Sequence, residues 1–293
     1  MNTIPPLPND TIVLWQKQFL TVLDRFETHA QGLFTFENER NVHQARVSLR
    51  TLTTFTGFLR SAPHKSLDLE LLNYLHARSR LILKTLGKIR DFDVTLGHIK
   101  DINQDKLDLQ RLSHVLELER QMARIELKLH LPKLLDDQLF ELWQTFIHVY
   151  LPQHLQYLNT QRHFKKLHKK FEHRYLTYLA HHEINGPAHL RTFEALHDVR
   201  LITKNLRYAY NYLEFALPGK AQLGAKARVK QYKRIQTQLG LMNDYTNLRE
   251  KLKQILEDYP YLVNTDTLAF RDKINKRLTK SLKSIVLPSI DDL

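Results

Sequence analysis

Long stretches of this 293-residue chain carry neither glycine nor proline, and apolar residues recur in them at helical spacing. Glycine occurs only 8 times, whereas leucine, lysine, arginine, glutamine and histidine are plentiful. These residues favour helices, and we find no alternation of apolar and polar residues that indicates a strand. An apolar fraction of 42% is enough for a buried core. The sequence therefore predicts an all-α protein.

Prolines, glycines and polar loops separate the predicted helices. Residues 1–10 are expected to form an extended leader, and the first helix runs from VLWQKQFLTVLDRF to near Gly32. We expect further helices at about 41–61, 67–99, 105–130, 134–150, 160–182, 190–216, 220–257 and 265–286. Pro132 is expected to separate two of these helices, and Pro152 to kink or end the second.

Two motifs recur in the two halves of the chain. VHQARVSL and LHDVRLITK each carry three basic side chains at i, i+3 and i+7: His43, Arg46 and Arg50, then His197, Arg200 and Lys204. LGKIRD at 86–91 matches LGLMND at 239–244 at nearly the same offset. Motifs that keep both their internal spacing and their mutual distance indicate a duplicated helical unit of about 150 residues. We place the two repeats at 11–158 and 159–288.

The basic residues of each repeat form a stripe along one side of a helix. At about 100° per residue, His197, Arg200, Lys204, Arg207 and Tyr208 fall within roughly a 100° sector. The apolar residues Ala195, Val199, Ile202, Leu206 and Leu213 lie nearly opposite and are expected to face the core. The first-repeat stripe is backed in the same way by Ala45, Leu52 and Leu59.

Acidic residues are absent where the stripes lie. The formal net charge is +13, and residues 40–67, 71–90 and 215–243 contain no Asp or Glu, whereas 101–141 contains nine. A solvated surface is one interpretation of a single basic helix. Acid-free basic helices at matched positions of a duplication instead predict a common polyanionic ligand. Arg, Lys and His together suit phosphate oxygens.

The predicted ligand contacts fall into two groups. The first contacts are His43, Arg46, Arg50, His197, Arg200, Lys204 and Arg207, and the flanking contacts are Arg80, Lys84, Lys230, Lys233 and Arg234. Tyr208 either donates its hydroxyl group to the ligand or packs. A further basic segment, RHFKKLHKKFEHRY at 162–175, is either a solvated face or an extension of the binding surface, and both interpretations stay open.

Several kinds of site are not indicated. The chain has no cysteine, which excludes disulfides and thiolate chemistry and fits a reducing cytosol. We find no signal peptide, no apolar run long enough to span a membrane, and no metal or nucleotide motif. We therefore predict no catalytic residue, metal or cofactor. Asp91 and Asp244 are expected to have structural roles, pairing with an arginine or capping a kinked helix.

The motifs resemble those of the CHAD family, which is named for its histidine-containing α-helical domain. The resemblance rests on VHQARV at 42–47, LGKIRDFDV at 86–94, LHDVRLITKNLRYAYNYLE at 196–214 and, more weakly, LGLMND at 239–244. It implies two pseudo-symmetric four-helix bundles packed around a basic groove or pore. It also implies inorganic polyphosphate as the ligand and association with polyphosphate granules. A triphosphatase domain often accompanies this family, but we find no ExExK-like start and the helical bundles are expected to occupy the sequence, so we expect a stand-alone member.

One departure from the family pattern lies in the first repeat. The family often has a second basic residue directly after the position of Arg50, where this chain has Thr51. Thr53 and Thr54 stand where the second repeat has Arg207 and Tyr208. We therefore expect the first-repeat surface to hold phosphate less firmly than the second.

The sequence as a whole predicts a cytoplasmic, non-enzymatic polyphosphate-binding protein. An RNA- or DNA-binding module is the first alternative, and it would need exposed aromatic residues for base stacking. A metal-dependent polyphosphate hydrolase is the second, and it would need several carboxylates close to the phosphate.

Overall fold

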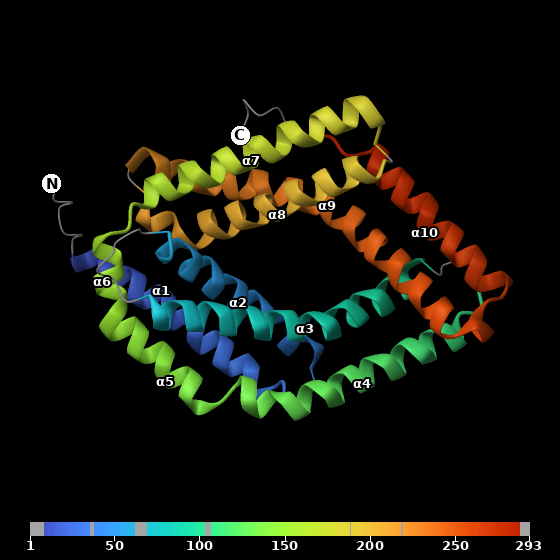
Figure 1. The fold of residues 1–293 in the computed structure, drawn as a ribbon, viewed down its shortest axis with the longest axis horizontal. Coiled ribbons are helices and arrows are strands. Elements are labelled where there is room, and N and C mark those ends of the chain that lie inside the picture. Colours follow the sequence, from blue (N-terminus) through green and yellow to red (C-terminus); the bar gives the residue numbers. More distant parts are fainter. Residues whose placement is uncertain are drawn as a thin grey trace. The chain divides into compact units, whose positions relative to one another are not determined.

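The computed structural model describes residues 9–35, 38–61, 69–102, 107–187, 189–217 and 219–287. All regular structure within these ranges is helical, which confirms the predicted all-α class (Figure 1). The elements are α1 Asn9–Gln31, α2 Glu39–Leu59, α3 Glu70–Ile102, α4 Gln110–Leu134, α5 Asp137–Thr145, η1 Phe146–Tyr150, α6 Leu151–Gln156, α7 Thr160–Asn185, α8 Leu190–Leu213, η2 Glu214–Ala216, α9 Gly219–Asp258, η3 Pro260–Leu262 and α10 Thr265–Lys283. Helix α1 begins inside the predicted leader, most of which lies outside the described residues.

The sequence predicted a break at Pro132 between α4 and α5. The observed break lies a few residues further along the chain. Pro132 is in the last turn of α4, which continues to Leu134. The Arg78 guanidinium donates a hydrogen bond to the Lys133 carbonyl, one of the groups that a helix end leaves without a partner. The Asp136 side chain then accepts a hydrogen bond from the Leu139 amide at 2.9 Å and so caps α5. These polar contacts, rather than the proline, set the boundary.

Pro152 ends no helix. A π-helical turn, η1, precedes it, and the Leu151 amide closes that turn on the Phe146 carbonyl. Pro152 occupies the first turn of α6, where a missing N–H group costs little because that group would have no partner within the helix. The wider turn therefore lets the chain pass the proline without breaking the helical path.

The chain forms two compact units, each built from three stretches of sequence. Unit 1 comprises Met1–Arg90, Met122–Lys165 and Tyr208–Ala225, and unit 2 comprises Asp91–Gln121, Lys166–Arg207 and Lys226–Leu293. The long helices α3, α4, α7, α8 and α9 contribute residues to both units. The units are defined by contacts and the repeats by sequence motifs, so the repeat boundary at 158–159 stays a prediction.

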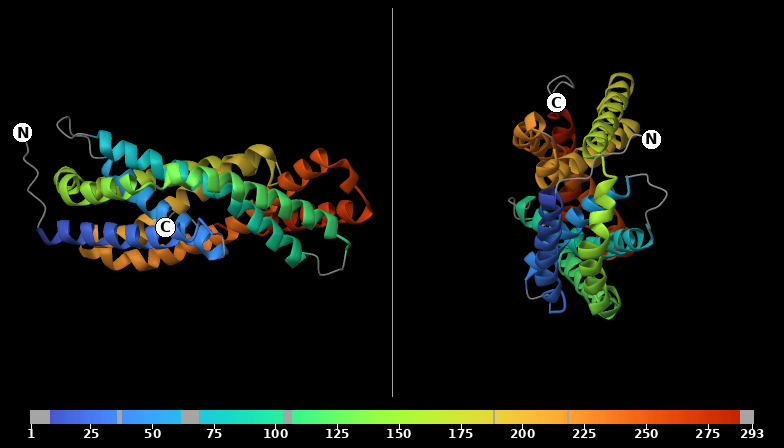
Figure 2. Two further views of the ribbon diagram at one scale, coloured as in Figure 1. Left: turned by 90° about the horizontal axis from the view of Figure 1, so that it is seen from below. Right: turned by 90° about the vertical axis from the view of Figure 1, so that its left-hand side faces the viewer.

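The core of unit 1 is an aromatic cluster centred on Phe19 of α1. Helices α1 and α2 lie side by side, and α6 and η1 also contact α1 (Figures 1 and 2). The Phe19 ring lies 4.8 Å from the Phe55 ring of α2, centroid to centroid, and 6.1 Å from the rings of both Trp143 and Phe146. All four side chains are fully buried. Edge-to-face pairs of this kind add to the free energy gained from burial.

Aromatic packing and polar pairs join the helices of unit 2. Phe171 of α7 packs edge-on against Tyr232 of α9, with 5.9 Å between the ring centroids. The Arg120 guanidinium of α4 contacts the buried carboxylate of Asp93 on α3 at 3.1 Å. Glu119, also on α4, accepts a 2.6 Å hydrogen bond from the Tyr259 hydroxyl. No helix within the described ranges combines the length and hydropathy needed to cross a bilayer.

The Phe19 cluster yields a stability prediction. Phe19→Ala should lower the free energy of unfolding by about 3–5 kcal/mol, because it removes a fully buried ring and leaves a cavity among three others. Phe34→Ala, at a side chain that is 42% exposed, is the matched control and should change it far less. Urea denaturation followed by circular dichroism measures both. Equal losses would show that the cluster is not the centre of the core.

Candidate functional site

The first-repeat stripe lies on the outer side of α2, as the sequence predicts. Ala45, Leu52 and Leu59 are fully buried, whereas His43 is exposed and Arg46 and Arg50 are half-buried. The helix thus divides into an apolar side in the unit 1 core and a basic side away from it, which confirms the predicted core residues.

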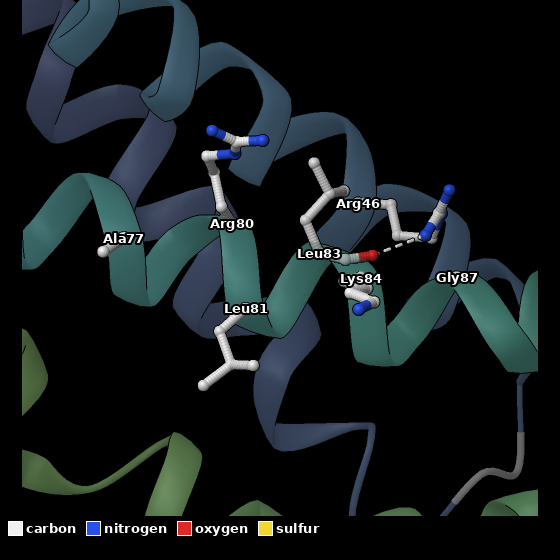
Figure 3. A pocket seen from close by; sticks show the side chains of 7 residues that line it. All are labelled: Arg46, Ala77, Arg80, Leu81, Leu83, Lys84 and Gly87. Atoms are coloured by element: carbon white, nitrogen blue, oxygen red, sulfur yellow. Dashed lines mark hydrogen bonds between the residues drawn. The ribbon is translucent and has the colours of Figure 1, made fainter.

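Arg46 crosses from α2 to the backbone of α3. Its Nη1 donates a 2.7 Å hydrogen bond to the Leu83 carbonyl (Figure 3). A Cβ atom on Gly87 would stand only 3.0 Å from the same nitrogen. Glycine at this position therefore gives the guanidinium room against the helix. This contact brings the two first-repeat motifs, VHQARV and LGKIRD, together in space.

A basic pocket opens beside this crossing, entirely within unit 1. It measures about 650 Å³ and is lined by Arg46, Ala77, Arg80, Leu81, Leu83, Lys84 and Gly87. Three of the predicted ligand contacts, Arg46, Arg80 and Lys84, thus come together around one space (Figure 3). Arg80 and Lys84 are exposed, and neither forms an ion pair with a carboxylate in the part of the chain that the structure describes. The pocket combines positive charge with open access to solvent.

Other cations of α3 have acidic partners within unit 1. Arg78 lies 3.6 Å from the Asp136 carboxylate, and Lys88 lies 3.7 Å from Glu126. Both acids come from the acid-rich segment at 101–141. The carboxylates thus pair with cations of α3 outside the pocket, which leaves Arg80 and Lys84 available to an external anion.

Arg90 joins the first-repeat cations, although the sequence did not predict it as a contact. Partial desolvation, then the positive charges of Arg90, Arg50 and Arg46, lower the pKa of His43 from its ordinary value. Arg90 of α3 therefore lies in the electrostatic field of the α2 stripe. Its place one helical turn after Gly87 is the sequence signal that would have identified it.

The second-repeat stripe on α8 has the predicted orientation in unit 2. Ala195, Val199, Ile202 and Leu206 are buried, and His197, Arg200, Lys204 and Arg207 are half-buried. One acid, Asp198, lies beside the stripe, and it pairs with Arg174 of α7. The following residue, Tyr208, belongs to unit 1, where it is buried and stacks on Tyr212 with 5.8 Å between centroids. Of its two predicted roles, packing is therefore the one that the structure supports.

The flanking contacts predicted on α9 form a separate exposed face of unit 2. Lys230, Lys233 and Arg234 are all exposed, while Tyr232 between them is buried. The Tyr232 hydroxyl lies 3.4 Å from Nδ1 of His168 on α7. Burial, followed by the charge of Arg228, lowers the pKa of His168 to about 4, so this imidazole is neutral at physiological pH. It belongs to the core rather than to the basic surface.

The two repeats differ at their motif glycines. A Cβ atom on Gly240 would meet nothing within 4 Å, whereas one on Gly87 would meet the Arg46 guanidinium. The close approach of an arginine to a helical glycine is thus present in the first repeat and absent at the described counterpart in the second.

The two motif aspartates, Asp91 and Asp244, lie in different surroundings. Asp244 is 3.9 Å from Nε2 of His98, a histidine rather than the arginine predicted as a partner. Asp91 is exposed, and its neighbour Asp93 forms the buried pair with Arg120. Among the described residues, no three side chains of His, Asp or Glu gather in a way that could hold a metal ion.

The glycine difference predicts unequal effects of the same substitution. Gly240→Ala should raise the free energy of unfolding by about 1 kcal/mol, because alanine is the better helix former and the added methyl group meets no neighbour. Gly87→Ala should recover less of that gain, since the methyl group pushes Arg46 from its bond to Leu83. Chemical denaturation compares the two variants. An equal gain at both positions would contradict the close approach of Arg46.

The His43 environment predicts a titration shift. Arg90→Gln should move the pKa of His43 upward, toward its ordinary value, because removing a nearby positive charge makes protonation more favourable. NMR titration of the imidazole measures the shift. Arg25→Gln on α1 is the control and should leave the His43 pKa where it is. An unchanged pKa in Arg90→Gln would show that Arg90 does not act on His43.

Comparisons with known proteins agree with the resemblance predicted from the motifs. The family model described as CHAD domain matches residues 17–253. The crystal structure of the CHAD domain from the plant Ricinus communis matches with a TM-score of 0.63 and 16% identity, covering 99% of this chain and 96% of that one. At this identity the similarity establishes the fold alone. No curated protein sequence matches the chain.

Proposed function

The chain belongs to the CHAD domain family, and from that premise we propose that it binds inorganic polyphosphate and does so without acting as an enzyme. Polyphosphate is a flexible chain of negatively charged groups with no bases and no apolar atoms. Its ligand surface needs dense positive charge and N–H donors, and needs nothing to read a sequence.

The unit 1 pocket is the observation that carries this proposal. Arg46, Arg80 and Lys84 line one open space, and the neighbouring carboxylates of Asp136 and Glu126 lie with other cations. The two arginines supply planar N–H donors and the lysine a mobile point charge, so consecutive phosphates can be held by different donors. Binding releases counterions from the polyanion and therefore weakens steeply as salt rises.

The exposed cations of unit 2 offer a second proposed contact surface. Lys230, Lys233 and Arg234 lie on one side of α9, and α8 carries the second-repeat stripe. A long polyphosphate chain gains affinity when several sites act on the same molecule. Association with polyphosphate granules and a cytoplasmic location follow from this ligand and form part of the proposal.

His43 gives the proposed binding a direction of pH dependence. Its pKa is lowered in the free protein, and a bound anion favours the protonated imidazolium. Binding therefore takes up a proton, and affinity rises as pH falls through the pKa of His43.

The two alternatives differ from polyphosphate binding in what they require. A nucleic-acid module gains from aromatic residues that stack on bases, and Tyr208, the aromatic residue of the predicted stripe, is buried. A metal-dependent hydrolase needs carboxylates near the phosphate, and Asp93 and Asp244 lie beside Arg120 and His98 instead. Both observations favour polyphosphate as the ligand.

Charge reversal in the pocket tests the proposal. The double variant Arg80→Glu with Lys84→Glu should weaken polyphosphate binding about tenfold or more, because charge-assisted hydrogen bonds to phosphate are lost and repulsion replaces them. The control, Lys17→Glu with Arg25→Glu, makes the same charge change at exposed positions of α1. Calorimetric titration with long-chain polyphosphate near physiological salt measures both, and equal affinities would show that the pocket is not the site. Tighter binding of single-stranded RNA in competition at matched charge would favour the nucleic-acid alternative.

A further inference from the structure

Helix α7 presents a surface that polyphosphate binding does not explain. Its inner side is occupied by aromatic residues: Phe164, Phe171, Tyr175 and Tyr178 are all buried. Most of the remaining side chains are exposed, so packing against the rest of the protein does not account for their composition. The basic segment noted in the sequence at 162–175 lies mostly on this outer side.

The outer side of α7 within unit 2 is basic near its beginning and apolar near its end. Lys166, Lys169 and His173 are exposed, and so are Leu176 and Ile184 further along the helix. At 100° per residue, these five side chains fall within a sector of about 80°. They form one continuous strip, which we call the α7 strip.

The lysines of the α7 strip are available to an external anion. Neither Lys166 nor Lys169 forms an ion pair with any carboxylate that the structure describes, whereas Arg174 on the flank pairs with Asp198. The acids Glu172 and Glu183 are exposed at the edge of the strip rather than along its centre. The strip therefore keeps a net positive charge at its basic end.

The apolar end of the α7 strip is exposed to solvent. Ile184 is 78% exposed and Leu176 is 53% exposed, and Leu179 beside them is 42% exposed. Single exposed leucines are common on protein surfaces, but here three apolar side chains lie within the last three turns of one helix. A soluble polyanion such as polyphosphate offers no apolar atoms to these side chains.

An anionic lipid surface offers both kinds of contact. Phosphate headgroups attract lysines that lie near the surface, and acyl chains accept apolar side chains that reach past the headgroups. We propose that the α7 strip docks the protein onto an anionic membrane surface, with Lys166 and Lys169 at the headgroups and Leu176 and Ile184 entering the boundary with the acyl chains. This docking is peripheral and is separate from the proposed polyphosphate pocket in unit 1.

Vesicle co-sedimentation of the full chain tests this proposal. The protein should bind vesicles of phosphatidylglycerol and phosphatidylcholine and bind phosphatidylcholine vesicles only weakly. Leu176→Gln with Ile184→Gln should weaken binding to the mixed vesicles about tenfold or more, since it removes the apolar contacts while keeping a good helix former. The matched control, Leu118→Gln with Val263→Gln, changes two exposed apolar residues elsewhere in unit 2 and should leave binding unchanged.

A charge-reversal variant tests the basic end of the α7 strip in the same vesicle assay. Lys166→Glu with Lys169→Glu should weaken binding to the mixed vesicles by at least about fivefold for each lysine lost. Lys276→Glu with Lys280→Glu makes the same charge change at exposed positions of α10 and should have little effect. If the lysine variant loses binding and the glutamine variant keeps it, the strip is a surface for polyanions and the proposal is wrong.

The vesicle result can be separated from the proposed function. The glutamine variant leaves every pocket residue in place, so it should bind polyphosphate as the unchanged protein does. Wild-type protein that binds both vesicle types equally, or neither, overturns membrane docking whatever the polyphosphate titration gives. Loss of polyphosphate binding in the pocket variant, in turn, says nothing about the α7 strip.

Discussion

The approach of Arg46 to the backbone of α3 is the contact on which the candidate site depends. Its hydrogen bond to the Leu83 carbonyl ties α2 to α3, and Gly87 provides the space in which the guanidinium lies. This hydrogen bond fixes the position of the guanidinium at the edge of the pocket. Arg80 and Lys84 project from neighbouring turns of the same helix, and the pocket forms where these three meet. Holding α2 against α3 and concentrating positive charge are therefore two effects of one contact.

The position of the acids matters as much as that of the bases. Glu126 and Asp136, both in unit 1, lie with Lys88 and Arg78. Exposed ion pairs of this kind add little to stability. Their larger effect here is on the electrostatic potential, because each acid that has a partner elsewhere is one fewer to neutralise the pocket.

The sequence predicted what depends on local pattern and missed what depends on distant partners. The helices and the buried side of each stripe, from Ala45 to Leu206, follow from period and polarity. The helix boundary near Pro132 depends on Arg78, which is more than fifty residues away, and pattern alone could not place it. The composition of the two units likewise depends on contacts between remote segments. Arg90 lay inside a recognised motif, but only the opposing α2 stripe reveals its electrostatic role.

The first-repeat threonines show how a weaker motif can still support a site. Thr53 and Thr54 donate hydrogen bonds to the Arg50 carbonyl of their own helix, at 2.9 and 2.8 Å. The hydroxyl hydrogens are therefore not available to donate to a phosphate. The cations that α2 lacks at these positions are supplied by α3, through Arg80 and Lys84.

Packing also determines which side chains helix α7 exposes. The buried aromatic residues of α7 fix the rotation of the helix about its axis. With that rotation fixed, the apolar side chains on the outer side cannot turn toward the core. The packing of Phe171 and Tyr175 therefore keeps Leu176 and Ile184 on the outer side of α7.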